Sequence, residues 1–360
     1  MKLKILDIYT DYLISSFGFT TATGLSKMLN NKLSHDKITR FLSSKEFKSK
    51  DLWEIAKPII RRIESDDGVI AIDDSIEEKP YSQENELICW HYDHSKARSL
   101  KGINFITAAY ISTDFTIPIL YDLVRKTETK LNKEGKKIRH SSLSKNDRYC
   151  NILKSCVQNN LAFKYVLNDV WYGSADNMNF VKKSLKKDFI MPLKKNRKVA
   201  LSETDKKNGR YVKIEKLCFE GNISKKVYLE RLDFPVILIK QIFKNGDGSS
   251  GVLYLVTSDL DLTYDQITTI YKKRWKVEEF HKSIKNNASL AKSPTKIPLT
   301  QANHFFVSMC AYIKLEGISI NRNINHFAIK ESIYIVALKN AYQKLKKLMT
   351  KDLRYNFDFA

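Results

Sequence analysis

The most informative stretch of this sequence is Tyr271-Lys-Lys-Arg274-Trp-Lys-Val-Glu278-Glu-Phe-His281-Lys-Ser-Ile-Lys285. On a helix, where each residue turns by about 100°, Tyr271, Arg274, Glu278 and Lys285 share a stripe roughly 60° wide, with apolar residues opposite. The pattern predicts a helix that packs one face on a core and presents four polar groups on the other. The simpler alternative is a solvated face with an Arg274–Glu278 ion pair, worth a few tenths of a kcal/mol.

The charge balance points to a polyanionic partner. Lysine and arginine outnumber aspartate and glutamate 62 to 40 in 360 residues, giving a formal net charge of +22. The excess is spread along the chain, which favours nucleic acid as the partner, although a Lys-rich proteome would also produce basic surfaces. No apolar run approaches the roughly 20 residues of a membrane span, and the start lacks a signal core. We therefore expect no membrane partner and a cytoplasmic protein.

The cysteine and histidine spacing does not predict a zinc site or a disulfide framework. The five cysteines are odd in number and show no paired CxxC spacing. His91 and His94 could suggest a pair of metal ligands, but no second ligand pair follows, so ordinary polar contacts are the expectation.

Residues 1–65 are expected to be helical. Two short helices are predicted at 23–29 and 34–42, the second with Ser34 as its N-cap, and an amphipathic helix follows at 51–63. The short pair resembles a helix-turn-helix, although such pairs are also common packing units. Its second helix would present to DNA the side chains of His35, Lys37, Thr39 and Arg40.

Two buried strands are each expected to end in aspartate. The apolar run 68–72 precedes Asp73 and Asp74, and the run that begins at Phe163 ends in Asp169. Carboxylates at the ends of buried strands are held rigidly beside open space, which suits metal ligands, although strand-end caps are the simpler reading. Between these segments the pattern predicts strands and a helix, joined by a Lys-rich linker. These lie at 103–111 and 116–124 (strands), 130–139 (linker) and 145–158 (helix).

The interval between Asp169 and Glu278 is longer than one helix, one strand and a final helix require. A strand at 189–193 opens into the basic cluster 194–198, which is either a solvated turn or a phosphate contact. Strand-like segments then predict a β-rich insertion. They lie at 210–218, 225–232, 235–243 and 251–256, and two further helices are expected at 299–315 and 325–348.

The spacing Tyr-x2-Arg-x3-Glu-x6-Lys at 271–285 matches the signature of the insertion-sequence four family of DDE transposases, the Tn-five-like enzymes. This resemblance implies an α/β fold, in which a ribonuclease-H-like catalytic core is interrupted by a β-rich insertion. It also implies an N-terminal helical DNA-binding domain, with helices after the core. The domain ranges expected on this basis are 1–65 (helix-turn-helix), 66–194 and 259–293 (core), 195–258 (insertion) and 294–360 (C-terminal helices).

The resemblance also implies the catalytic residues. Asp74, Asp169 and Glu278 would hold two Mg²⁺ ions, for which Mn²⁺ can substitute. Asp74 is chosen because the family's first aspartate precedes Thr or Ser, and Asp73 is the reserve. Some relatives carry a basic residue after the second aspartate, whereas this chain has Val170, so a phosphate contact there does not carry over. The family stacks an indole on a flipped base, but 199–273 contains no Trp. Tyr228, Phe243 and Tyr254 are the alternatives for this stacking; because aromatic residues in strands are more often part of the core, none is assigned.

The function implied by the resemblance is cut-and-paste DNA transposition. The enzyme would act on double-stranded DNA at terminal inverted repeats and on target DNA, as a homodimer in the DNA complex. It would be cytoplasmic and associated with the bacterial nucleoid. Tyr271, Arg274 and Lys285 would bind backbone phosphates, and Arg40 would contact DNA from the N-terminal helix pair. Two alternatives are a nuclease with the same core that does not transpose DNA and a catalytically inactive DNA-binding regulator of transposition.

Overall fold

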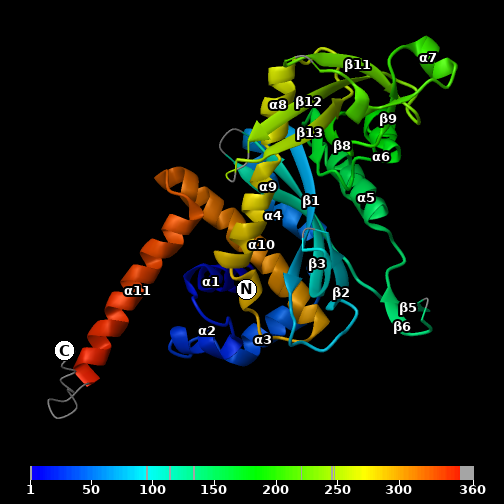
Figure 1. The fold of residues 1–360 in the computed structure, drawn as a ribbon. Coiled ribbons are helices and arrows are strands. Elements are labelled where there is room, and N and C mark those ends of the chain that lie inside the picture. The colour runs from blue at the N-terminus through cyan, green and yellow to red at the C-terminus, as the bar shows by residue number, and fades with distance from the viewer. Residues whose placement is uncertain are drawn as a thin grey trace, which may run out of the picture. The chain divides into compact units, whose positions relative to one another are not determined.

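The computed structural model describes residues 2–94, 96–112, 115–132, 134–219, 221–244, 246 and 248–348 (Figure 1). These residues form two compact units. The larger contains 46–282 and 296–298, and the smaller contains the described parts of 1–45, 283–295 and 299–360. The large mixed sheet lies entirely in the larger unit, and each unit is described separately below.

The sheet of the larger unit has the order β10-β9-β11-β12-β13-β8-β7-β1-β3, and both β2 and β4 pair with the outer side of β3. β1, β3 and β4 are antiparallel neighbours, whereas β7 and β8 run parallel to β1. The strands are β1 (Val69–Glu78), β2 (Cys89–Asp93), β3 (Arg98–Ile111), β4 (Thr116–Leu123), β7 (Tyr165–Asn168), β8 (Asp188–Leu193), β9 (Lys198–Ala200), β10 (Val212–Lys213), β11 (Ser224–Leu229), β12 (Val236–Lys244) and β13 (Ser250–Thr257).

β1 is longer than the sequence pattern predicts. Its apolar part, Val69–Ile72, is buried on both faces and pairs with β3 on one side and β7 on the other, as expected of a central strand. Pairing with β7 ends at Ile72↔Asn168, but pairing with β3 continues to Glu78. Asp73 and Asp74 therefore lie inside β1, because the long β3 supplies hydrogen-bond partners along the whole strand.

The insertion is β-rich, as predicted, and it extends the main sheet because β13 pairs antiparallel with β8. The prediction of a strand at 210–218 is mostly wrong. Only Val212–Lys213 pairs with β9, and a 3₁₀ turn follows at Ile214–Lys216. A short helix that the pattern missed, α7 (Glu203–Lys207), precedes it and is capped by Ser202, whose hydroxyl accepts a hydrogen bond from the Asp205 N–H.

Helices flank the sheet. α4 (Ser49–Ile63) packs on β4, α5 (Lys145–Gln158) packs on β3 and β4, and α6 (Ala175–Asn179) continues into a π-helical turn, Phe180–Ser184. His281 shares a hydrogen bond with Thr107 of β3. The helix predicted through the 271–285 stretch is in fact two helices, α8 (Tyr264–Lys272) and α9 (Trp275–Asn286), drawn in yellow in Figure 1. Tight i→i+3 hydrogen bonds at Lys273 and Arg274 replace the continuous α-helical pattern.

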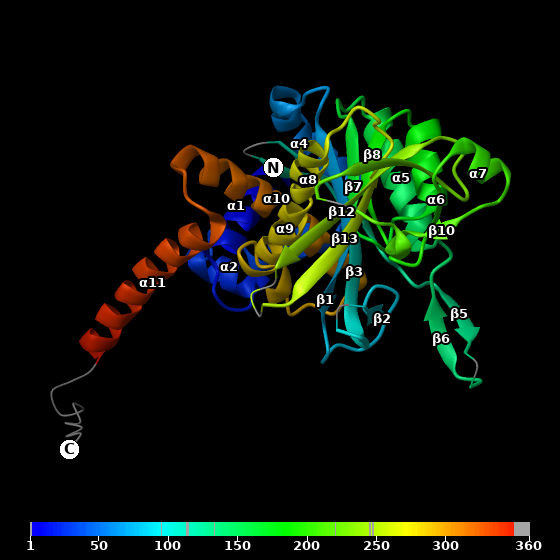
Figure 2. The ribbon, with the colours of Figure 1, turned by 45° about the horizontal axis from the view of Figure 1, so that its top comes forward.

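The expected Lys-rich linker at 130–139 is instead a hairpin of β5 (Glu128–Leu131) and β6 (Lys137–His140). Gly135 adopts φ +75°, a conformation that favours glycine, in the turn between the strands. Figures 1 and 2 show this hairpin extending away from the sheet to which its ends are attached.

The smaller unit is helical. It contains α1 (Lys2–Ser15), α2 (Ala22–Met28), α3 (His35–Ser43), a 3₁₀ turn (Leu290–Lys292), most of α10 (Pro298–Arg322) and α11 (His326–Leu348). Ser34 caps α3 as predicted, because its hydroxyl accepts a 3.4 Å hydrogen bond from the Lys37 N–H. The buried Asn303 side chain donates to the carbonyls of Leu42 and Lys45, which joins the end of α3 to α10. Within the described ranges, no helix is both long and apolar enough to cross a bilayer.

Candidate active site

Two aspartates meet where the parallel pairing of β1 and β7 stops. Asp73 and Asp169 each follow directly after the last paired residues, Ile72 and Asn168. Because the two strands are parallel, their next residues emerge at the same edge. Asp169 accepts hydrogen bonds at its Oδ1 from the backbone N–H groups of Trp171 (2.8 Å) and Tyr172 (3.4 Å), which fixes the carboxylate on the turn after β7.

Asp73 is the most strongly perturbed of these carboxyl groups. Burial, together with the nearby negative charge of Asp169, raises its pKa to about 7, and the positive charge of Arg274 opposes this rise. Burial also raises the pKa of Asp169, to which the charge of Asp74 contributes. A strongly raised carboxyl pKa in a cluster of acids is typical of a functional site, because stability alone does not require such a cluster.

Asp74 faces the opposite side of the sheet from Asp73, as successive residues of a strand do. Its carboxylate accepts hydrogen bonds from Lys145 Nζ (2.7 Å), the Tyr172 hydroxyl (3.1 Å) and Asn104 Nδ2 (3.4 Å). Lys145 is the first residue of α5, so that helix supplies a cation to the acidic cluster.

The conspicuous 271–285 stretch reaches the same edge of the sheet. The Tyr271 hydroxyl donates to the Asn168 carbonyl at 3.2 Å. Arg274 contacts two acids at once, with Nη2 at 2.5 Å from Glu278 Oε1 and Nη1 at 3.5 Å from Asp73 Oδ2. Three of the four stripe residues therefore converge on the aspartates, although the helix breaks between Tyr271 and Glu278.

The remaining two candidates, Lys285 and Arg40, belong to the smaller unit. Lys285 lies in the last turn of α9, in the part of that helix assigned to the smaller unit. Arg40 is exposed on α3, also in the smaller unit. Their roles stay predictions.

The donor set fits a divalent cation by its chemistry, since hard cations prefer carboxylate oxygens and these acids come from three separate segments. Burial is the main cause of the raised pKa values of Asp73 and Asp169, and the neighbouring carboxylates add to the rise in both cases. Within the described residues, no group of three acidic, histidine or cysteine side chains is arranged to hold a metal ion. Arg274 and Lys145 bind the carboxylates in this structure instead.

Three residues of this site were not singled out from the sequence: Lys145, Trp171 and Tyr172. Lys145 Nζ lies 5.5 Å from the Trp171 ring centroid as well as against Asp74, and the Trp171 side chain is partly exposed beside Asp169. The Trp-Tyr pair directly after Asp169 was a possible signal. Lys145 offered none, because its helix start lies far from the aspartates in sequence.

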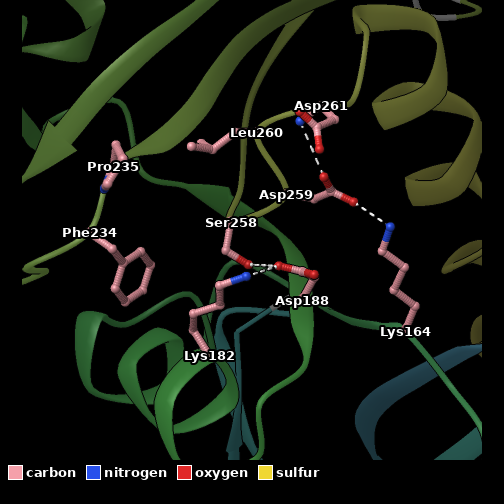
Figure 3. Close-up of a pocket in the computed structure, with 9 residues that line it drawn as sticks. All are labelled: Lys164, Lys182, Asp188, Phe234, Pro235, Ser258, Asp259, Leu260 and Asp261. Carbon is pink, nitrogen blue, oxygen red and sulfur yellow. Dashed lines mark hydrogen bonds and ion pairs between the residues drawn. The ribbon is translucent and has the colours of Figure 1, made fainter.

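A separate pocket lies at the opposite end of the parallel strands, where β7 and β8 begin (Figure 3). Its charged groups neutralise one another: Lys164 pairs with Asp259 at 2.8 Å, and Lys182 pairs with Asp188 at 2.6 Å. Ser258 also donates a hydrogen bond to Asp188. This pocket is distinct from the carboxylate cluster and adds no group to it.

Comparison with known proteins agrees with the chemistry of the cluster. Residues 2–217 match a family model described as DDE superfamily endonuclease, and residues 135–314 match a model described as transposase DDE domain. No curated protein matches the chain. Such domains act on DNA and use divalent metal ions. The chain therefore belongs to the DDE superfamily of endonucleases and transposases.

Proposed function

We propose that this protein is a DNA transposase of the insertion-sequence four type, which cuts element ends and joins them to target DNA. The observation that carries the proposal is the contact of Arg274 with both Asp73 and Glu278 beside Asp169. It brings the Tyr-x2-Arg-x3-Glu part of the signature to the strand ends that carry the aspartates. A solvated helix face, the simpler reading of the stretch, would not make these contacts.

The strand order supports a ribonuclease-H-like core. In β4-β3-β1-β7-β8 the first three strands are antiparallel neighbours and the last two run parallel to β1. The insertion leaves after β8, and the chain returns through α8 and α9. The core therefore closes on the helix that carries Glu278, which is the arrangement expected from the resemblance.

For the chemistry, we propose that Asp169, Glu278 and one aspartate of β1 are the metal ligands. The resemblance selects Asp74, whereas packing favours Asp73, which Arg274 links to Glu278. Two bound Mg²⁺ or Mn²⁺ ions would activate the attacking hydroxyl and stabilise the departing 3′-oxygen. Arg274 would shift from carboxylates to a phosphate when DNA arrives, for which its planar fork is suited, and Tyr271 would position the same strand.

The DNA contacts outside the core are proposals from the resemblance. Ser34 caps α3, on which the side chains of Lys37 and Arg40 are exposed, as a recognition helix requires. Lys285 would bind backbone phosphate as a point charge. The domain ranges expected from the sequence also remain proposals, as do terminal inverted repeats as the substrate and the location at the nucleoid.

A homodimer in the DNA complex is supported by the apolar surface of α11. Ile335, Leu338, Tyr342 and Leu345 are exposed and follow one another at spacings of three, four and three residues. This is the repeat of a helix that packs along a second helix.

The experiment is strand cleavage of DNA that carries the sequences flanking the gene, with Mg²⁺ or Mn²⁺. Glu278→Ala should abolish cleavage and leave DNA binding unchanged. Glu279→Ala is the matched control, because Glu279 is exposed on the next position of α9 and should be dispensable. Cleavage that survives in Glu278→Ala would refute the assignment, and cleavage without preference for paired ends would favour the non-transposing nuclease. DNA binding without cleavage by the unaltered protein would favour the inactive regulator.

A further inference from the structure

The hairpin β5–β6 is an exposed, basic projection whose function the carboxylate cluster does not explain. Residues 126–140 contain six Lys or Arg and two Glu, and Leu131 is 65% exposed on the strand itself. An isolated two-stranded hairpin is marginally stable in water. Its exposure and charge therefore suggest a surface for a partner.

The root of the hairpin is anchored to the rest of the larger unit by two contacts. Arg139 lies 3.7 Å from Glu84, and Lys126 donates a 2.5 Å hydrogen bond to the Trp90 carbonyl. Farther out, Lys130 and Lys137 are exposed, and no ion pair is found for either within the residues that the structure describes. Two cations thus remain available at the outer part of the hairpin.

The pairing register places these cations on both faces of the ribbon. Lys130 lies opposite Ile138 and Lys137 lies opposite Leu131, and directly paired residues share a face. A ribbon with cations on both faces matches the major groove of DNA, which is wide enough for two strands and has phosphates along both walls. A purely apolar partner would leave these charges unpaired.

The hairpin is also close in sequence to the carboxylates. Only five residue steps separate His140, the end of β6, from Lys145, which binds Asp74. Such a segment spans at most about 18 Å, roughly half of the 34 Å helical turn of DNA. A duplex whose backbone lies at Asp74 can therefore reach the hairpin within one turn.

We propose that β5–β6 is a DNA-binding arm. It would enter the major groove of double-stranded DNA beside the cleavage site, with Lys130 and Lys137 as phosphate contacts. This inference rests on the proposed function, because it assumes that DNA lies at the carboxylates. It adds a contact surface outside the signature residues and outside the N-terminal helix pair.

The test is binding of a fluorescent 40-base-pair duplex, without divalent metal, at NaCl concentrations from 50 to 200 mM. The logarithm of the association constant falls with the logarithm of salt concentration, and each lost phosphate contact makes this slope less negative by about 0.9. Lys130→Ala with Lys137→Ala should therefore flatten the slope by about 1.8 and weaken binding on the order of 10- to 60-fold at 0.1 M salt. The matched control is Lys207→Ala with Lys213→Ala, which removes two exposed lysines from the insertion.

A second variant, which keeps every lysine, should increase DNA affinity instead of decreasing it. Glu134 lies 3.6 Å from Lys136 at the hairpin turn, so Glu134→Gln should strengthen binding. An unchanged salt slope in the double lysine variant, or an equal loss in the control, overturns the inference. A changed oligomeric state without DNA also overturns it, because the partner would then be a second copy. If the double lysine variant binds DNA normally and the unaltered protein cleaves DNA, the inference about the hairpin is wrong and the proposed function is unaffected. If the unaltered protein does not bind DNA, both proposals are wrong.

Discussion

Replacing Asp73 with asparagine should stabilise the metal-free protein at pH 8. The folded carboxyl has a pKa of about 7 and the unfolded one a pKa of 3.8. Between these values the folded state holds a proton that the unfolded chain has released, so stability falls as the pH rises. Between pH 3.8 and pH 7, the free energy of unfolding should fall by up to about 4 kcal/mol because of this carboxyl group, at 1.36 kcal/mol per pKa unit. The asparagine side chain cannot ionise, so the Asp73→Asn variant should escape this loss.

The replacement is also close to isosteric. The Asp74 N–H donates to Asp73 Oδ1 at 2.8 Å, and an asparagine oxygen can accept the same hydrogen bond. The increase in the free energy of unfolding of Asp73→Asn over the unaltered protein should therefore be near zero at pH 3.5 and approach its full size at pH 8. Asp74→Asn is the matched comparison and should have the opposite sign, because it weakens the contacts of Asp74 with Lys145 and Tyr172.

The assay is urea unfolding with a chelator present, from pH 3.5 to pH 8, for the unaltered protein and both variants. Added Mg²⁺ should stabilise the unaltered protein and should lose this effect in whichever variant removes a metal ligand. The reasoning is refuted if Asp73→Asn is no more stable than the unaltered protein at pH 8. It is equally refuted by a gain that is the same at pH 3.5 and pH 8.

Three further predictions concern the surroundings of the site. Burial lowers the pKa of His91 to about 3, so below pH 6.5 the unfolded chain binds a proton that the folded state does not. The free energy of unfolding of the unaltered protein should therefore fall by about 1.4 kcal/mol per pH unit between pH 6 and 4 because of this histidine. His91→Leu should remove this loss, as measured by urea unfolding at each pH. A Cβ on Gly173 would lie 2.3 Å from the Pro192 carbonyl oxygen, so Gly173→Ala should displace the turn after Asp169 and reduce the cleavage rate tenfold or more, with duplex binding retained. Tyr172→Phe removes the hydroxyl bound to Asp74 and should lower the free energy of unfolding by about 1 kcal/mol, where an unchanged value would contradict the contact.

Much of the architecture was readable from the sequence, because it depends on local periodicity and end signals. The helix at Lys145–Gln158 has the predicted bounds, and its N-cap Ser144 forms a capping box with Asp147. The strands at β4 and β8 follow from short apolar runs between turn signals. The hairpin at 128–140 was missed because its charged composition conceals the strand pattern, and α7 because the insertion otherwise reads as strand.

The sequence by itself determined which side chains are candidates for the site: the acidic strand ends and the spacing of Tyr271, Arg274 and Glu278. Spacing acts within one segment, so it could not determine which of Asp73 and Asp74 shares a sheet face with Arg274, nor that Lys145 lies against Asp74. Those contacts depend on sheet register and on how helices cross the sheet, which join residues far apart in the chain. Only the tertiary structure therefore decided the electrostatics of the cluster, because the pKa of each carboxyl depends on burial and on charges brought near by folding.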